Sequence, residues 1–150
     1  MHTKGFTKLE LLIAVAILGV VVAISAFIVN GSRAVQRDAK RVSDVTVLRS
    51  GLSQYWLRNA SYPELENVSL GSADSGILGM TTEGFVGGGG GGSVILEFIP
   101  TGPKNNEFYL YSGSQNGYSI QFTTERDTAF GLKGTYYAHS DGVDQQQTVR

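Results

Sequence analysis

Hydrophobic positions follow two different patterns in the first part of the chain. Residues 11–29 are nineteen consecutive positions without a charge, long enough for a membrane-spanning helix and longer than a signal-peptide core. From residue 32 to about Asn59, apolar residues recur at spacings of three and four, and Tyr62-Pro63 then stops a helix. We therefore predict one long helix, apolar all round at first and amphipathic afterwards. Its apolar stripe comprises Val42, Val45, Leu48, Leu52, Tyr55 and Trp56.

The rest of the chain predicts loops and short strands. Residues 64–93 are rich in glycine and include an unbroken run from Gly87 to Gly92, so a loop-rich excursion with an exposed or hinge-like loop at 84–93 is expected. Short strand-like runs follow, and residues 108–124 form the clearest hairpin. Three or four antiparallel strands against the amphipathic helix give an α+β head. Its tyrosines are expected to pack the sheet: Tyr109, Tyr111, Tyr118, Tyr136 and Tyr137.

Composition and charge narrow the picture further. The 150 residues fit one domain with a modest core, and the absence of cysteine excludes disulfides, thiolate zinc sites and cysteine nucleophiles. Residues 1–59 carry eight basic and three acidic side chains, whereas the remainder carries four basic and ten acidic ones. Opposite charges in the two halves could attract one another between neighbouring copies.

The residues before the apolar run decide how to interpret it. The chain starts MHTKG, continues with Phe6, and places Glu10 just inside the apolar run. A plain signal anchor, or a secretory signal cleaved weakly near Ala23-Ile24-Ser25, would account for the run alone. Neither kind of segment requires a carboxylate at the start of a membrane helix. A carboxylate there costs free energy unless it is paired.

The segment MHTKGFTKLELLIAVAILGVVVAI resembles the class III signal of type IV pilins and of the pseudopilins of type II secretion systems. The resemblance implies that a prepilin peptidase cuts between Gly5 and Phe6 on the cytoplasmic side and methylates the new N-terminus. It also matches Glu10 with the family's glutamate at the fifth mature position. Residues 37–63 are similar to the corresponding part of major pseudopilins and of many pilins. The implied structure is the pilin fold, a long N-terminal helix packed on a small antiparallel sheet.

A physical role for Glu10 can be argued from the residues themselves. Cleavage leaves a positive amine on Phe6, at the end of a helix whose N-terminal dipole is also positive. In a staggered bundle of such helices, the carboxylate of one copy can meet the amine of another, and an unpaired Glu10 in the apolar core would be expensive. We therefore expect the pairing to favour one register of assembly. The alternative is a Glu10 that is solvated at the level of the lipid headgroups.

The expected organisation follows from these assignments. Residues 1–5 are the leader, residues 6–30 the transmembrane and filament-core helix, and residues 31–150 the head, with its C-terminal sheet at 94–138. The precursor crosses the cytoplasmic membrane once with its N-terminus inside. It then becomes a homo-oligomeric helical filament outside the cell or in the periplasm, with a prepilin peptidase and a pilus or secretion assembly platform as partners.

Several functions fit this organisation. The main hypothesis is a non-enzymatic structural subunit of a type IV pilus-like filament, a fimbrium at the cell surface. The alternative within the class is a pseudopilin of a type II secretion or competence (DNA uptake) apparatus. From another class, the chain could be a monomeric membrane-anchored binding module. A third possibility is a secreted enzyme with a conventional signal, but the sequence contains no recognisable pairing of a nucleophile with a base.

Two clusters suggest further ligands, and in both the plainer interpretation is favoured. Four basic residues lie near one face of the predicted helix, but no aromatic residues interleave with them, so a solvated face, or one that meets acidic residues of neighbouring copies, is favoured over DNA binding. They are Arg33, Arg37, Lys40 and Arg41. Asp141 and Asp144 could contribute to a calcium loop, as in some major pseudopilins, but their spacing does not match an EF-hand and an ordinary polar turn is favoured. No other cofactor is expected.

Overall fold

The computed structural model describes residues 7–80, 84–88 and 93–150, and for Phe27, Val29 and Asn30 it describes the backbone alone. Contacts group the chain into two compact units, Met1–Val35 and Gln36–Arg150. We call the second unit the head. The expected leader at residues 1–5 lies outside the described residues.

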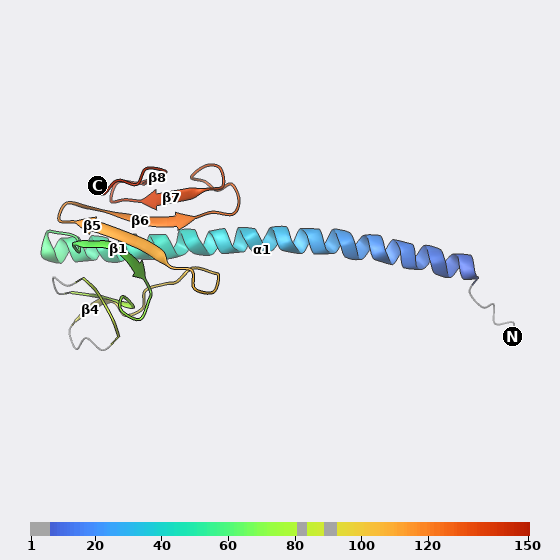
Figure 1. Cartoon of the computed structure of the whole chain (residues 1–150), viewed down its shortest axis with the longest axis horizontal. Coiled ribbons are helices and arrows are strands. Elements are labelled where there is room, and N and C mark those ends of the chain that lie inside the picture. The colour runs from blue at the N-terminus through green and yellow to red at the C-terminus, as the bar shows by residue number, and fades with distance from the viewer. Residues whose placement is uncertain (1–6, 81–83, 89–92) are drawn as a thin grey trace. The chain divides into compact units, whose positions relative to one another are not determined.

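A single helix, α1, runs from Lys8 to Asn59 (Figure 1). Its end is set by Ala60, which has a left-handed φ of 52° and donates its N–H to the carbonyl oxygen of Trp56 at 2.8 Å. This is the usual way in which a helix C-terminus satisfies one of its last carbonyls. Tyr62-Pro63 follows and prevents any continuation. The predicted continuous helix with its end near Asn59 is confirmed.

The head contains a five-stranded antiparallel sheet in the order β1-β5-β6-β7-β8. Its central hairpin pairs β5 with β6 in a continuous register from Leu110 opposite Gln121 to Ser114 opposite Gly117. The hairpin predicted at residues 108–124 is therefore confirmed. The strands are β1 (Leu65–Leu70), β5 (Tyr109–Ser114), β6 (Gly117–Thr123), β7 (Thr135–Ala138) and β8 (Val143–Asp144).

The expectation of a loop-rich excursion at residues 64–93 is wrong in part. This region supplies edge strand β1 and two strands of a second sheet, which has the order β3-β2-β4 and the members β2 (Ile77–Gly79), β3 (Phe85–Val86) and β4 (Val94–Leu96). These strands are short and separated by glycines, so they escape a search for periodic runs, but they bury Leu70, Leu78 and Phe85. Within the expected 84–93 loop, Gly89–Gly92 lie outside the described residues.

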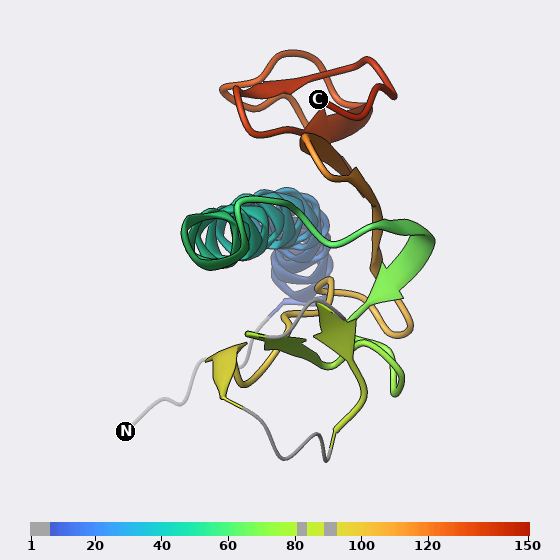
Figure 2. The same ribbon diagram turned by 90° about the vertical axis from the view of Figure 1, so that its left-hand side faces the viewer.

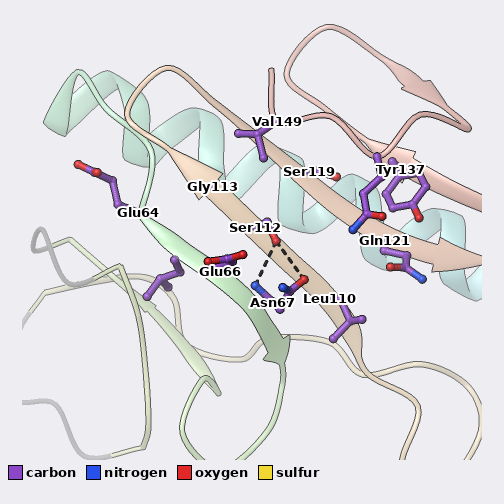
Figure 3. A pocket seen from close by; sticks show the side chains of 12 residues that line it. Glu64, Glu66, Asn67, Leu110, Ser112, Gly113, Ser119, Gln121, Tyr137 and Val149 are labelled. Atoms are coloured by element: carbon purple, nitrogen blue, oxygen red, sulfur yellow. Dashed lines mark hydrogen bonds between the residues drawn. The ribbon is translucent and has the colours of Figure 1, made fainter.

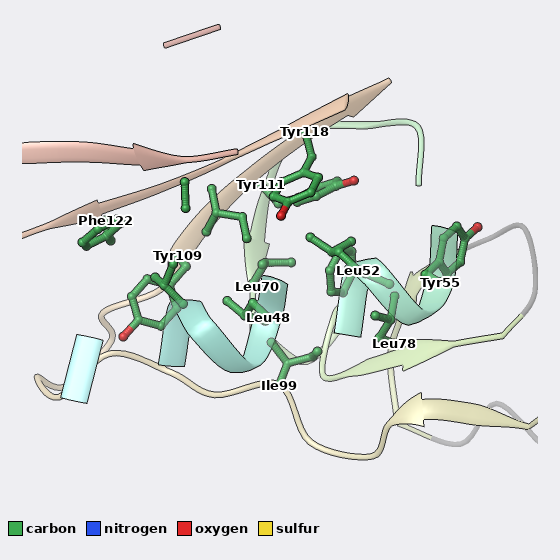
Figure 4. Close-up of a cluster of buried hydrophobic side chains, with 14 of the residues drawn as sticks. Leu48, Leu52, Tyr55, Leu70, Leu78, Ile99, Tyr109, Tyr111, Tyr118 and Phe122 are labelled. Carbon is green, nitrogen blue, oxygen red and sulfur yellow. The ribbon is translucent and has the colours of Figure 1, made fainter. Parts of the chain in front are cut away.

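The two sheets lie against different sides of the head part of α1 (Figure 2). Leu48, Leu52 and Tyr55 of the helix are almost completely buried in one cluster with residues from both sheets (Figure 4). Four of the six residues in the predicted stripe are buried, whereas Val42 is half-buried and Trp56 is exposed. The tyrosines also behave as predicted, because Tyr109, Tyr111, Tyr118 and Tyr136 are buried and Tyr137 is half-buried.

One glycine of β5 makes room for a buried hydrogen bond. The hydroxyl of Tyr111 donates to the carbonyl oxygen of Pro63 at 2.9 Å, and a Cβ on Gly113 would lie 2.2 Å from that hydroxyl and 2.4 Å from that oxygen. The Gly113→Ala variant must break this bond or shift β5, so we expect it to lower the free energy of unfolding by about 1–3 kcal/mol. Urea denaturation measures the loss. Gly142→Ala is the control, because no atom of the described part of the chain lies within 4 Å of the added Cβ.

The structure thus has one long N-terminal helix whose C-terminal part packs on antiparallel sheet. The predicted α+β class and pilin-like arrangement are confirmed. The helix presents two features for functional interpretation: an apolar segment whose described large side chains are exposed, and a head segment that carries a dense set of charges.

Candidate functional site in the N-terminal helix

The apolar segment of α1 exposes its large side chains. Their exposed fractions between Leu9 and Ile28 range from 49% at Ile13 to 68% at Leu9. The helix is long and apolar enough to cross a membrane. A soluble monomer rarely exposes a contiguous apolar surface of this extent, so lipid or other helices must cover the segment.

Glu10 closes the N-terminal end of this segment through a capping box with Thr7. The Glu10 N–H donates to Thr7 Oγ1 at 3.2 Å, and the Thr7 N–H donates back to Glu10 Oε2 at 3.4 Å. Each residue thereby satisfies a backbone donor that the first turn of a helix leaves free. The Thr-x-x-Glu spacing was visible in the sequence but was not used in the prediction. Glu10 is exposed, so its second carboxylate oxygen remains accessible to a partner.

Polar groups further along the segment are already satisfied. Ser25 donates its hydroxyl to the carbonyl oxygen of Val21 at 2.8 Å, and Ser32 donates to Ile28 at 3.1 Å. Such back-bonding lets a hydroxyl enter an apolar environment at little cost. Among the described residues, no atom lies within 4 Å of the Cβ position of Gly19, which leaves this point open to the close approach of another helix. The segment is therefore suited to helix packing in lipid or in a filament core.

The two predicted processing residues, Gly5 and Phe6, lie outside the described residues. Glu10 is the one predicted site residue that the structure describes. It lies in the first turn of α1, and its role in assembly stays a prediction.

A buried cation in the head segment of α1 organises the charges there. Arg41 is 1% exposed and forms a bidentate pair with Glu107, with Nε to Oε1 at 2.6 Å and Nη2 to Oε2 at 3.0 Å. Its Nη1 also contacts Asp38 Oδ1 at 2.7 Å and Glu125 Oε1 at 2.9 Å. Burial disfavours the charged guanidinium, but the hydrogen bonds with these carboxylates outweigh it and raise the pKa of Arg41. One guanidinium therefore joins α1 to the loops before β5 and after β6.

Glu125 is the second centre of this ion cluster. Arg37 pairs with it in a bidentate manner at 2.8 and 2.6 Å, and Lys104 Nζ lies 3.1 Å from its Oε1. The hydrogen bond from Arg37 is the main cause that lowers the pKa of Glu125 well below its ordinary value, against the opposing effect of burial. Asp38 holds the same loop by accepting the backbone N–H groups of Glu125 and Arg126 at 3.0 and 2.9 Å.

A neighbouring pair extends the ion cluster along the helix. Lys40 Nζ contacts Asp44 Oδ2 at 2.5 Å and donates to the carbonyl oxygen of Thr101 at 2.6 Å. The buried hydroxyl of Tyr109 donates to the same Asp44 oxygen at 2.8 Å. Burial, and then this hydrogen bond to a carboxylate, raise the pKa of Tyr109.

The expectation that the basic cluster meets acidic residues of neighbouring copies is wrong for three of its four members. Arg37, Lys40 and Arg41 are paired within the head, because the loops before β5 and after β6 bring Glu107 and Glu125 to the helix. Sequence reasoning missed these acidic partners, which lie 66 and 88 positions away from their cations. The spacing of Asp38–Arg41 and Lys40–Asp44 was the only local signal. Phosphate contacts would have to compete with these pairs, which further weakens the case for DNA binding.

Asp141 and Asp144 are held by an arginine. Arg150 Nε lies 3.5 Å from Asp141 Oδ1, and its Nη2 contacts Asp144 Oδ2. The backbone N–H of Gln146 and the charge of Arg150 lower the pKa of Asp144. In the part of the chain that the structure describes, no three histidine or carboxylate side chains lie close enough to hold a metal ion.

A groove of about 490 Å³ lies on the face of the five-stranded sheet, between the start of β1 and the strands β5, β6 and β7 (Figure 3). Its lining includes Glu64 and Glu66 at one side, Leu110 and Ser112 of β5, and Tyr137 of β7. Ser112 fixes one wall, since its hydroxyl accepts the N–H of Asn67 at 3.1 Å. We call this the sheet groove. Sequence reasoning missed it, because the strand that contributes its acidic residues was not predicted.

Comparison with known proteins gives a consistent result. Core protein G of the type II secretion system of Klebsiella pneumoniae is 28% identical over 119 residues, which cover 76% of this chain and 78% of the relative. The same component of Vibrio cholerae serotype O1 is 26% identical over 138 residues, covering 87% and 86%. That of Dickeya chrysanthemi is 36% identical over 63 residues, covering 42% and 41%.

No family model and no solved structure matches the chain. The Klebsiella pneumoniae and Vibrio cholerae relatives nevertheless span most of both chains, and the shared name of the relatives agrees with the residues that suggested the resemblance. The predicted resemblance is confirmed: over most of its length this chain is similar to core protein G of type II secretion systems.

Proposed function

We propose that the chain is a structural pseudopilin of a type II secretion system, which polymerises through the apolar part of α1. The observation that carries this proposal is the exposed apolar segment of one helix, with a single acidic residue, Glu10, in its first turn. A helix of this kind serves either as a membrane anchor or as the core of a bundle. Glu10 favours the bundle, because an anchor needs no carboxylate at this place.

The relatives favour the secretion apparatus over a surface pilus. All six similar proteins carry the name core protein G of the type II secretion system. The main hypothesis of the sequence analysis, a subunit of a type IV pilus-like filament, therefore describes the same kind of filament less specifically than a pseudopilin of a secretion system does. A competence pseudopilus would use the same helix, but three of the four basic residues considered for DNA binding, Arg37, Lys40 and Arg41, are engaged within the head.

Processing and location follow from this proposal. The precursor sits in the cytoplasmic membrane with residues 1–5 inside, and a prepilin peptidase removes them and methylates Phe6. The new amine of one copy then pairs with Glu10 of a neighbour as residues 6–30 enter the filament core. The head remains on the periplasmic side, works without a resident cofactor and catalyses no reaction.

Complementation tests this proposal. The chain is expressed in a bacterium that retains its prepilin peptidase and secretion platform but lacks its own core protein G. We expect filaments in sheared fractions and restored secretion of an exported enzyme. Full membrane insertion without filaments would support the monomeric anchor instead. Filaments on the cell surface without restored secretion would support the pilus.

Calcium is expected to have little effect on the head, because Arg150 already pairs with both Asp141 and Asp144. The thermal midpoint of the purified chain should be the same, within a degree or so, in excess calcium and in a chelator. A calcium-dependent rise of several degrees would instead show that the metal displaces Arg150. Asp144→Asn is the control variant, since it should abolish any such rise.

A further inference from the structure

The charges that remain after the internal pairs are counted are not scattered evenly over the head. Among the described residues of the head, Arg126 and Lys133 are the two cations whose side chains find no hydrogen-bond or ion-pair partner. Both belong to the loop between β6 and β7. This loop also exposes two apolar residues, Phe130 at 38% and Leu132 at 73%. We call residues 126–133 the basic loop.

The basic loop is held in a defined shape. Thr128 and Gly131 exchange backbone hydrogen bonds at 2.9 and 3.1 Å, and the N–H of Lys133 is accepted by Asp127 Oδ1 at 3.0 Å. The ring of Phe130 packs 6.1 Å from those of Phe122 and Tyr136.

A rigid loop that presents an uncovered leucine between two cations loses little entropy when it binds a partner. Leu132 itself is fixed on the protein side, since its carbonyl oxygen accepts the hydroxyl of Tyr136 at 2.5 Å. Its side chain nevertheless stays in solvent, as an anchor residue would before it meets a pocket.

The sheet groove has the opposite character. Glu64 and Glu66 are exposed and have no ion-pair partner among the described residues, and the lining contains no lysine or arginine. Leu110, 36% exposed, and Val149, 44% exposed, supply an apolar floor beside Tyr137 (Figure 3). The volume of about 490 Å³ lies in the range of pockets that accept a specific ligand. An anionic, partly apolar groove selects a cationic segment that carries an apolar anchor.

We propose that the basic loop of one copy docks in the sheet groove of the next copy. The charges match, Leu132 and Phe130 match the apolar floor, and both surfaces belong to the same head. A contact between two different patches of identical subunits is heterologous, so it repeats and generates a ring or an open helix. This inference rests on the proposed function, because packed N-terminal helices would bring the heads together at the high local concentration that a shallow contact requires.

The absence of cysteine permits a direct test in the full-length chain. A Glu66→Cys, Lys133→Cys double variant is assembled in cells and mildly oxidised. Each chain then carries both halves of the contact, so we expect a ladder of disulfide-linked dimers, trimers and longer species. Each single variant should give no ladder beyond the dimer. The matched control is Glu97→Cys with Lys133→Cys, since Glu97 is exposed and forms no ion pair with the residues that the structure describes, but lies outside the groove.

Charge reversal supplies the second arm. Replacing Arg126 and Lys133 by glutamate should lower filament yield by more than about tenfold, because like charges then face one another across the contact. Adding Glu64→Lys and Glu66→Lys in the same chain should restore it. The backbone N–H of Arg126 keeps its bond to Asp38 in these variants. The urea midpoint, followed by fluorescence of the single tryptophan, checks that the head still folds.

The two proposals fail differently. The loop-in-groove contact is overturned if filaments form without a ladder of disulfide-linked species and if the charge reversal does not change the filament yield. The pseudopilin function would then still stand. A ladder from the Glu97→Cys control that matches the Glu66→Cys one also overturns it, because the loop would then meet another surface. If the unmodified chain forms no filament and no ladder is found in membranes, both proposals fail together.

Discussion

Replacing Glu10 by alanine is expected to leave the chain in the membrane and to abolish its assembly into filaments. The substitution strands the amine of Phe6 of a neighbouring copy in an apolar core. Removal of one partner of such a desolvated pair costs about 3–5 kcal/mol, which lowers the subunit association constant more than about a hundredfold. Membrane fractionation measures insertion, and electron microscopy of sheared material measures assembly.

The capping box makes a sharper version of this experiment possible. Glu10→Gln removes the charge but keeps a residue type that still completes a capping box with Thr7. Thr7→Val does the reverse, since it removes the hydroxyl that caps the helix and keeps the carboxylate. If the charge matters, Glu10→Gln fails to assemble and Thr7→Val assembles. The opposite pattern would assign Glu10 a role in helix capping alone.

Replacing Arg41 by methionine is expected to destabilise the head by about 3–5 kcal/mol, because it leaves Asp38, Glu107 and Glu125 without their shared cation. Urea denaturation followed by Trp56 fluorescence measures the change. Lys40→Met is the control, since its pair with Asp44 is half-exposed on the lysine side and should be worth less than about 1 kcal/mol. Equal losses in the two variants would contradict the central place given to Arg41.

The same ion cluster predicts how stability depends on pH. The pKa of Glu125 is lower in the folded head than in the unfolded chain, so the unfolded chain binds the extra proton first. The stability that Glu125 contributes is therefore present at neutral pH and is lost as the pH falls below the ordinary carboxyl value of about 4.3. The urea midpoint should drop across this range. The drop should be smaller in Glu125→Gln, which has no carboxyl to protonate.

Some elements could be predicted because their signals are local. The apolar run, the three-and-four spacing and Tyr62-Pro63 fix α1, and the turn residues at 114–117 fix the hairpin of β5 and β6. The role suggested for Glu10 rests on a charge in an apolar run, which is also visible without any fold. These features need no knowledge of distant contacts.

Other elements depend on contacts between distant residues and could not be predicted. β1 is bulged at Asn67, whose φ is 52°, and its pairing with β5 forms only when the chain returns some forty residues later. Two of the acidic partners of Arg41, Glu107 and Glu125, come from separate loops, so their charges looked available for neighbouring copies. The sheet groove required both β1 and the hairpin to be in place. The strand β1, the ion pairs of Arg41 and the sheet groove all depend on tertiary contacts and not on local propensity.

The N-terminus of the chain recovered from assembled material tests the central claim most directly. Intact-mass and fragment spectra of the sheared fraction should show a chain that starts at an N-methylated Phe6, which supplies the amine that Glu10 needs. A chain in that fraction that still carries residues 1–5 would contradict the claim, because the amine would then lie outside the apolar core and could not pair with Glu10.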